Sequence, residues 1–485
     1  MTATPDTSLA ILIGNESMIA ESIEPAYING AVSYWYQGAG LPKPRSPLAG
    51  DLDVDVCVVG AGLTGLWTAY YLKRECPDLR IAIVEKEFSG FGASGRNGGW
   101  LSAEPAGQVQ RWAKRQGHQA AVAMQRAMFG AVDEVIARAA EEGIEADIVK
   151  DGLLHVATND AQHARLAARV DRWREWGWGA QDLVLLSRAE TDQRVRVAGT
   201  RSAAYTPHCA RIQPAKLVRG LAEVVERLGV RIFERTEVTE IRPRAAVTPY
   251  GTVRASYVLR ATEGFTAALS GHRRTWLPMN SSLIVTEPLP DGVWSEIGWS
   301  GAELLGDEAH AYCYLQRTAD GRIAIGGRGV PYRFGSRWDQ KGQTHETTVR
   351  ALRDQLARLF PAAADVRVAH TWSGVLGVPR DWCATVHVDQ STGLGWAGGY
   401  VGHGVTSANL AARTLRDLVL RRDTDLVRLP WVHHRVRSWE PEPLRWLGVR
   451  TLYVAYRFAD RQENKGGAKT SMIARWADVV SGRIG

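Results

Sequence analysis

The chain has 485 residues, of which 45% are hydrophobic and 23% charged, and these proportions are ordinary for a globular enzyme. The length is sufficient for a large core and for two domains with a tail. The net charge of +7 and the pI of about 9.2 come from basic residues that are spread along the chain, so we predict solvated helix faces and no nucleic-acid partner.

The cysteines and the charge-free stretches argue against several further kinds of protein and site. The five cysteines are widely scattered and form no C-x-x-C pair, which argues against a disulfide framework, a zinc site and a redox dithiol and fits a reducing cytoplasm. We predict no metal site. No Lys or Arg occurs before Lys43, so we expect no secretory signal with a basic n-region. Residues 56–72 lack charges but contain three glycines, so we predict no membrane span there.

The first sustained pattern begins after residue 50. Residues 1 to about 30 show no period and are interpreted as an extension laid over the surface, followed by a loop that leads into the first strand. Residues 54–59 then predict a strand, residues 66–73 a helix and residues 80–84 a second strand.

The turn between the first strand and the helix carries the sequence G-A-G-L-T-G at residues 60–65. In a dinucleotide-binding turn, Gly60 permits the tight bend, Gly62 lets the backbone approach a pyrophosphate, and Gly65 lets helix and strand pack closely. Glu85 lies 20 residues beyond Gly65, where an acid holds ribose hydroxyls. The combination predicts a dinucleotide-binding unit with phosphates at the helix N-terminus, and an ordinary βα turn is the alternative.

A second glycine-rich loop follows at residues 90–99, with seven small residues around one Phe, one Arg and one Asn. Such a loop lets a flat ligand lie against backbone, and Arg96 is available to a phosphate or a carboxylate. Beyond it, helices are predicted over residues 120–142, 162–176 and 215–228, and strands over residues 152–157, 230–233, 238–241 and 257–261. His155 lies between apolar neighbours in a strand and is interpreted as structural.

Residues 276–370 change to short alternating strands, which predict a separate antiparallel sheet in a substrate domain. Residues 394–397 then predict a strand that runs into G-G-Y-V-G-H-G at residues 398–404 and a helix over residues 406–420. This is a second glycine turn at a helix N-terminus. The remaining residues are rich in Trp and Arg and are interpreted as a packed tail with helical stretches.

Three motifs together carry a family resemblance. They are G-A-G-L-T-G-L at residues 60–66, F-G-A-S-G-R-N-G-G at residues 91–99 and G-G-Y-V-G-H-G at residues 398–404. With them the chain resembles the FAD-dependent amine oxidases of the D-amino-acid oxidase/glycine oxidase superfamily, and among these it looks most like the γ-glutamylputrescine oxidase group. The resemblance runs from about Ser33 to about Leu420. Further landmarks are Gly326, Gly327, Trp372, Gly374 and Asp381.

The resemblance implies an α/β fold with two domains, a Rossmann-like FAD-binding domain and a mixed, antiparallel β-sheet substrate domain that covers the flavin. The expected division is residues 51–107, 201–275 and 371–425 for the FAD-binding domain, residues 108–200 and 276–370 for the substrate domain and associated helices, residues 1–50 for the N-terminal extension with its loop, and residues 426–485 for a C-terminal helical tail.

The resemblance also implies a reaction, the oxidation of the C–N bond of a primary or secondary amine, or of an amino acid, by hydride transfer to flavin N5. Water would hydrolyse the imine to an aldehyde or oxo product, and dioxygen would reoxidise the flavin and give hydrogen peroxide. The expected partners are therefore a small-molecule amine or amino acid and dioxygen, with no nucleic acid and no membrane. The expected location is the cytoplasm, and the oligomeric state is not predicted.

Residue roles follow from the same resemblance. The glycines of the first turn would take the pyrophosphate, Glu85 the ribose, the second loop the phosphate and flavin ring, and Val238 the adenine. The residues expected to bind FAD are Gly60, Gly62, Leu63, Thr64, Gly65, Glu85, Lys86, Ala93, Ser94, Gly95, Arg96, Asn97, Gly98, Gly99, Val238, Thr262, Gly399, Gly402, His403, Gly404, Val405 and Thr406. Those expected to be catalytic are His403, Tyr312 and Tyr314, although His403 could be a turn residue only and one of the tyrosines could face the core.

The sequence also departs from its relatives. Trp100 stands where they often have Gln, Glu263 stands where Asn is usual, and residues 322–325 offer no lysine of the kind that helps oxygen react in some oxidases. An FAD dehydrogenase with another electron acceptor is therefore the alternative, and a flavin-binding protein without turnover is a remoter one. Cys313 and His403 are conceivable points of covalent attachment, but we expect noncovalent FAD.

Overall fold

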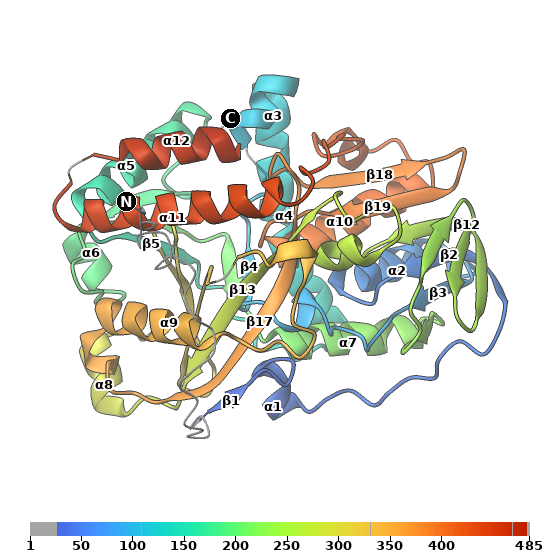
Figure 1. Cartoon of the computed structure of the whole chain (residues 1–485), viewed down its shortest axis with the longest axis horizontal. Helices are drawn as coiled ribbons and strands as arrows, with labels where there is room; N and C mark the ends of the chain where they lie inside the picture. The colour runs from blue at the N-terminus through green and yellow to red at the C-terminus, as the bar shows by residue number, and fades with distance from the viewer. Residues whose placement is uncertain (1–26, 108, 330, 468, 483–485) are drawn as a thin grey trace, which may run out of the picture.

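The computed structural model describes residues 27–107, 109–329, 331–467 and 469–482, and most of the expected N-terminal extension lies outside them. The described strands form a nine-stranded, an eight-stranded and a two-stranded sheet, and helices cover the two large sheets (Figure 1). The predicted mixed α/β fold with two large sheets is therefore confirmed.

The eight-stranded sheet is built around the first predicted strand. Val58 pairs with Ile83 on one side and with Leu259 on the other, and all three side chains are buried, as is usual for parallel strands covered on both faces. The parallel strands are β2 (Leu52–Val59), β3 (Ile81–Val84), β9 (Arg231–Phe233), β12 (Gly251–Arg260) and β19 (Leu394–Gly398). Antiparallel additions are β10 (Glu240–Arg242), β11 (Ala245–Thr248) and β18 (Thr385–Asp389).

The carboxyl ends of four parallel strands meet at one edge of this sheet. β2, β3, β12 and β19 run in the same direction. The segments that follow them therefore lie at the same edge: the first glycine turn (residues 60–65), Glu85, residues 261–263 and the second glycine turn (residues 398–404). This edge is where open parallel α/β sheets bind ligands.

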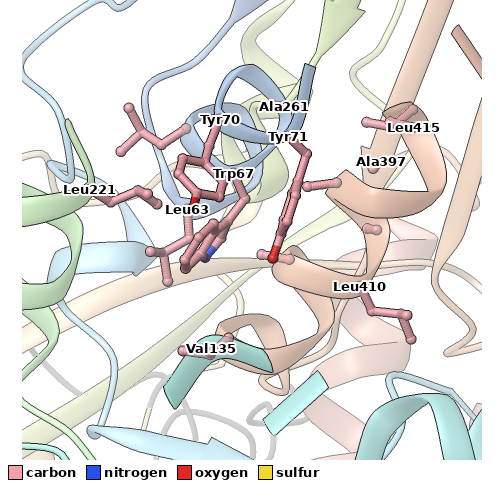
Figure 2. Close-up of a cluster of buried hydrophobic side chains, with 14 of the residues drawn as sticks. Leu63, Trp67, Tyr70, Tyr71, Val135, Leu221, Ala261, Ala397, Leu410 and Leu415 are labelled. Carbon is pink, nitrogen blue, oxygen red and sulfur yellow. The ribbon is translucent and has the colours of Figure 1, made fainter. Parts of the chain in front are cut away.

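Helix α2 (Leu63–Glu75) forms the core beside this sheet, and every residue from Leu63 to Lys73 is buried. It packs between α10 (Gly404–Val419) and α7 (Pro214–Arg227), with α4 (His118–Glu141) close by. Figure 2 shows Trp67 and Tyr71 in this cluster, and their stacked rings have centroids 5.7 Å apart. The Tyr71 hydroxyl donates to Glu134 and accepts a hydrogen bond from Asn409, so its polar atom is satisfied although the ring is buried.

The nine-stranded sheet is mostly antiparallel, as predicted for the second sheet. In spatial order its strands are β1 (Ile28–Asn29), β17 (Val368–Val378), β13 (Leu277–Thr286), β16 (Ile323–Gly327), β15 (Tyr314–Arg317), β14 (Leu304–Asp307), β5 (Leu153–Ala157), β7 (Ser202–Thr206) and β6 (Val184–Ser187). Only β1 with β17 and β14 with β5 pair in parallel in this sheet, among the residues that the structure describes.

Three details of this sheet differ from the sequence prediction. The expectation of short strands is wrong for β13 and β17, because residues 277–286 are buried throughout and pair along their whole length. In addition, β7 pairs with β5 and β6 although residues 201–275 were assigned to the other domain. Most of β17 was assigned there as well, yet it pairs with β13. Strand pairing therefore does not follow the predicted boundaries at residues 200 and 370.

The remaining elements cover the sheets and connect them. β4 (Trp100–Ser102) pairs with β8 (Cys209–Arg211). The other helices are α1 (Trp35–Ala39), α3 (Val109–Gln116), α5 (Asp160–Glu175), α6 (Arg188–Asp192), α8 (Asp291–Ile297), α9 (Glu346–Leu359), α11 (Leu444–Asn464) and α12 (Met472–Ser481). Short 3-10 helices occur at Ala93–Gly95, Glu263–Ala268, Phe334–Ser336, Pro361–Ala363 and Asp425–Arg428.

Candidate active site

The first glycine turn has no room for side chains. Gly60 has a φ of +108°, and a Cβ atom there would lie 2.7 Å from the carbonyl oxygen of Ala261. A Cβ atom on Gly65 would lie 2.1 Å from the carbonyl oxygen of Gly60, so this glycine lets α2 pack against the turn. A Cβ atom on Gly62 would lie 2.9 Å from Oγ of Ser94. The turn is therefore built for close backbone contacts.

Glu85 is held at the wall of the same turn. Its Oε2 accepts a hydrogen bond from the backbone N–H of Ala61 at 2.8 Å, and its Oε1 accepts one from Glu87 at 2.9 Å. Burial raises the pKa of Glu85, and these two hydrogen bonds oppose that effect. The carboxylate is thus fixed beside the glycine turn, at the position where the sequence predicts a contact with ribose.

The second glycine loop is fixed by Arg96. The guanidinium of Arg96 donates to the carbonyl oxygens of Phe91, Gln340 and Ser373 at 2.7, 2.9 and 3.2 Å and lies over the ring of Phe91. Burial lowers the pKa of Arg96 to about 10. These carbonyls take three of the five N–H groups of the guanidinium, so the side chain holds the loop in place. A contact of Arg96 with a phosphate or a carboxylate stays a prediction.

A cavity of about 540 Å³ connects these loops with the nine-stranded sheet. Most of the predicted site residues line it: Gly60, Gly62, Leu63, Thr64, Glu85, Lys86, Ala93, Ser94, Arg96, Asn97, Gly98, Val238, Thr262, Tyr312, Tyr314, Gly402, His403, Gly404 and Val405. The predicted residues that do not line it are Gly65, Gly95, Gly99, Gly399 and Thr406. Gly95 and Gly99 belong to the second glycine loop but pack against other residues, because a Cβ atom there would meet Tyr36 or Gln316.

Two helix N-termini open into this cavity, and in neither does the residue before the helix cap it with its side chain. The first turn of α2 starts at Leu63, whose N–H donates to Oγ of Ser94 at 2.8 Å. The first turn of α10 starts at Gly404, after a turn in which Gly399, Val401 and Gly402 have positive φ. Free N–H groups and the helix dipole make both ends favourable for negative charge.

Tyr314 forms one wall of the cavity. Its ring fills the space that two glycines leave, because a Cβ atom on Gly98 or Gly326 would lie 2.6 or 2.3 Å from it. The hydroxyl shares a hydrogen bond with Oγ of Ser281 at 2.9 Å, and burial raises the pKa of Tyr314 to about 12. Tyr312 also faces the cavity and accepts a hydrogen bond from Arg328 at 3.3 Å. Neither tyrosine faces the core instead of the cavity.

An acid and two histidines also meet on this wall. Nε2 of His155 lies 3.1 Å from Oε1 of Glu104, and Nδ1 of His403 lies 3.6 Å from Oε2 of the same carboxylate. Nδ1 of His155 lies 3.4 Å from Oε1 of Glu308, which also pairs with Arg169 at 2.6 Å. All five residues line the cavity. His155, which the sequence led us to interpret as structural, therefore has acidic partners on the cavity wall.

The charges in this cluster set its protonation. Burial alone would raise the pKa of Glu104, but the charge of His155 and its hydrogen bond outweigh burial and hold the pKa of Glu104 below its usual range. Burial lowers the pKa of His403, and the nearby carboxylate of Glu104 only partly opposes this. Glu104 is therefore an anion and His403 a neutral imidazole at neutral pH.

Glu263 stands where Asn is usual in relatives, and it connects three segments at the carboxyl edge of the eight-stranded sheet. Its carboxylate accepts hydrogen bonds from the backbone N–H groups of Gly399, Gly377 and Tyr400 at 2.8, 3.1 and 3.2 Å. Burial raises the pKa of Glu263 to about 7, although these three hydrogen bonds favour its charged form. The acid thus connects the end of β12, β17 and the second glycine turn at the cavity wall.

Comparison with known proteins decides the family. The sequence profile described as DAO: FAD dependent oxidoreductase matches residues 55–418. The chain belongs to this family. It is accordingly an FAD-dependent oxidoreductase, and the glycine loops, the two open helix N-termini and the cavity fit a long dinucleotide. The predicted enzyme class and cofactor are confirmed.

Individual members of the family are distant in sequence. The γ-glutamylputrescine oxidoreductase of Escherichia coli (strain K12) is 29% identical over 401 residues, which cover 81% of this chain and 89% of that protein. The glycine oxidase of Geobacillus kaustophilus (strain HTA426) is 26% identical over 380 residues, which cover 76% of this chain and 94% of that protein. The crystal structure of glycine oxidase from Geobacillus kaustophilus matches with a TM-score of 0.66 at 22% identity, covering 79% of this chain and all of that one. The fold is therefore that of glycine oxidase.

The charged cavity-lining residues that sequence reasoning missed include Glu104, Arg169, Glu308 and Arg328. Glu104 offered a signal, since it follows the second glycine loop by only five residues. The others come from elements of the nine-stranded sheet and its helices, whose pairing could not be placed from the sequence. His155 offered a signal as well, as the only polar residue in the strand L-L-H-V-A.

Proposed function

We propose that this enzyme oxidises the C–N bond of a primary or secondary amine, or of an amino acid. The observation that carries the proposal is the cluster of Glu104, His155 and His403 on the wall of the cavity that the FAD loops open into. Relatives named for glutamylputrescine, glycine and sarcosine support the same substrate class. Bound FAD supplies a hydride acceptor at flavin N5.

The residues that would hold FAD include both glycine turns, Glu85 and Val238. The backbone at Gly60 and Gly62 and the first turn of α2 would bind the pyrophosphate, Glu85 the adenosine ribose, and the backbone of Val238 the adenine. The first turn of α10, with Gly404 and Val405, would lie at the pyrimidine edge of the flavin, where a positive helix end favours negative charge. Gly65, Gly95, Gly99, Gly399 and Thr406 would support these segments from behind.

The polar cluster would handle the proton of the amine. An ammonium group has no lone pair to assist hydride departure, so the substrate nitrogen must lose a proton first. His403 is kept neutral by burial and would accept this proton at Nε2, while Glu104 faces Nδ1 and stabilises the imidazolium that forms. Tyr312 and Tyr314 would position the substrate by their rings and hydroxyls.

A cation beside the turn that carries His403 favours a substrate with an acidic group. Arg328 lines the cavity, and its guanidinium bonds the Tyr312 hydroxyl and the carbonyl oxygen of Val401. Such a cation binds a carboxylate well. An amine that carries a carboxylate or another acidic group would therefore meet a cation at Arg328 and an anion at Glu104.

For the electron acceptor we propose dioxygen, with hydrogen peroxide as the product, and for the location the cytoplasm. The alternative is a dehydrogenase that passes electrons to a non-oxygen acceptor, because residues 322–325 contain no lysine. We also propose the two domains described above, with β7 and the whole of β17 moved to the substrate domain because they pair there.

A panel of amines and amino acids tests the proposal, read in parallel by peroxide release and by reduction of an artificial dye. We expect members of the panel to bleach the flavin anaerobically and to release peroxide in air. Dye reduction without peroxide would favour the dehydrogenase. Bleaching by alcohols or hydroxy acids, with no response to any amine, would contradict C–N oxidation, and no bleaching at all would favour a flavin-binding protein without turnover.

A further inference from the structure

The two C-terminal helices carry a large exposed apolar surface. Exposed fractions reach 67% for Val454 and 75% for Met472, and the helices lie side by side on the outside of the molecule (Figure 1). The nine exposed apolar residues, here called the α11–α12 patch, are Leu444, Leu447, Val454, Phe458, Met472, Ile473, Trp476, Val479 and Val480. Exposed apolar surfaces of this extent mark sites that contact proteins or membranes.

The patch is separate from the faces by which these helices pack on the protein. α11 buries Val449, Tyr456 and Ala459, and α12 buries Ala474 and Ala477. Each helix therefore already has an apolar inner face, and its outer apolar face adds nothing to this packing. The family profile ends at residue 418, so the patch also lies outside the part of the chain that defines the family.

The charges around the patch have one sign. Every exposed charged residue on the two helices is basic: Arg450, Arg457, Arg461 and Arg475. The three acids of these helices turn inward. Asp460 accepts from the backbone of His310 and Ala311, Glu463 pairs with Arg165, and Asp478 accepts from Tyr456. The outward surface of α11 and α12 thus combines apolar side chains with arginines and offers no exposed acid.

We propose that the α11–α12 patch docks on the surface of an anionic lipid membrane. Apolar side chains that include Trp476 and Phe458 would enter the boundary between headgroups and acyl chains, and the arginines would meet lipid phosphates. The cytoplasmic leaflet supplies the negative charge. No helix in the described part of the chain is long and apolar enough to cross a bilayer, so the contact is peripheral.

A second copy of the chain fits this surface less well. In a twofold contact the same patch faces itself, and arginines of one copy would meet arginines of the other without an exposed acid on either pair of helices. An anionic lipid surface has no such conflict. The docking also has a consequence for the site, because Tyr453 of α11 lines the cavity and the membrane would lie on the other side of the same helix.

Sedimentation of the full-length holoprotein with vesicles tests the proposal. We expect binding to vesicles of phosphatidylcholine with phosphatidylserine, much weaker binding to phosphatidylcholine alone, and weakening by salt. Arg450→Gln and Arg475→Gln should each weaken binding about fivefold. Phe458→Ser combined with Trp476→Ser should weaken it about tenfold or more. Tyr250→Ser is the matched control, because this ring is 51% exposed at the turn between β11 and β12.

Flavin content and thermal unfolding, measured on each variant, show whether it is folded. Absence of binding by the full-length protein, or binding that the patch substitutions leave unchanged, would overturn the proposal. The proposal would also be overturned if the protein does not bind vesicles but forms a dimer, seen by light scattering, that the same substitutions abolish. Residues 1–26 contain four acids and no Lys or Arg. Vesicle binding that appears only after their removal would identify them as the occupant of the patch and would also overturn it.

Discussion

Oε1 of Glu104 lies 3.1 Å from Nε2 of His155, and this contact joins the segment after the second glycine loop to β5 of the other large sheet. The second carboxylate oxygen of Glu104 faces His403 at the start of α10. Three segments that are far apart in sequence thus place one acid and two imidazoles on the wall of one cavity. In such a cluster each charge sets the proton affinity of its neighbours.

Glu104→Gln should slow anaerobic reduction of the flavin by an amine about 100-fold at neutral pH, with little change in flavin content. Glutamine keeps the size of the side chain but removes the charge that stabilises a protonated His403. The rate should still rise with pH and level off, with its midpoint moved to lower pH because the carboxylate raises the pKa of His403. Glu134→Gln is the control, since this acid bonds Tyr71 outside the cavity. An unchanged rate and midpoint in Glu104→Gln would contradict the role of the cluster.

The first glycine turn could be predicted from the sequence, because the residues that form it are close together in the chain. The strand, glycine turn and helix around Gly62 lie within about 20 residues, and each glycine has a steric reason that acts between near neighbours. The acidic partners of His155 could not be found from the sequence, because Glu104 and Glu308 lie 51 and 153 residues away. The same holds for Arg96, since two of its carbonyl acceptors, on Gln340 and Ser373, lie 244 and 277 residues away.

Gly62→Val should abolish most FAD binding. Even a Cβ atom at this position would lie 2.9 Å from Oγ of Ser94, and the two further methyl groups would occupy the space where backbone meets pyrophosphate. The ratio of flavin to protein absorbance measures the effect. Gly50→Ala should keep its flavin, because a Cβ atom there would have no neighbour within 4 Å. Near-normal flavin content in Gly62→Val would contradict the assignment of the first glycine turn.

The purified protein should contain one FAD per chain, and acid precipitation should release it into the supernatant. Cys313 lines the cavity, but burial raises the pKa of this thiol well above its usual value. The thiolate needed to attack a flavin is therefore scarce. Separation of pellet and supernatant, followed by chromatography of the flavin, checks the prediction. Colour that stays with the pellet, or FMN in the supernatant, would count against noncovalent FAD.

Glu263 should make the stability of the protein depend on pH. Burial raises its pKa in the folded state to about 7 from an ordinary value of 4.5, so folding binds a proton between these values. The stabilisation from this group is complete below pH 4.5 and is lost as pH rises through about 7. The difference between these two pKa values corresponds to about 3 kcal/mol at most.

A comparison of wild type with Glu263→Gln by urea unfolding at several pH values isolates this contribution. The amide that replaces the carboxyl group does not titrate. Its NH₂ group would face one of the backbone N–H donors that bond Glu263 in the wild type, and two donors cannot bond each other. The variant should therefore be less stable than the wild type at pH 5. The difference in unfolding free energy between the two proteins should then shrink by about 2 kcal/mol between pH 5 and pH 8, because only the wild type loses a proton. A difference that stays constant, or that grows with pH, would show that the three hydrogen bonds from Gly377, Gly399 and Tyr400 keep Glu263 ionised throughout.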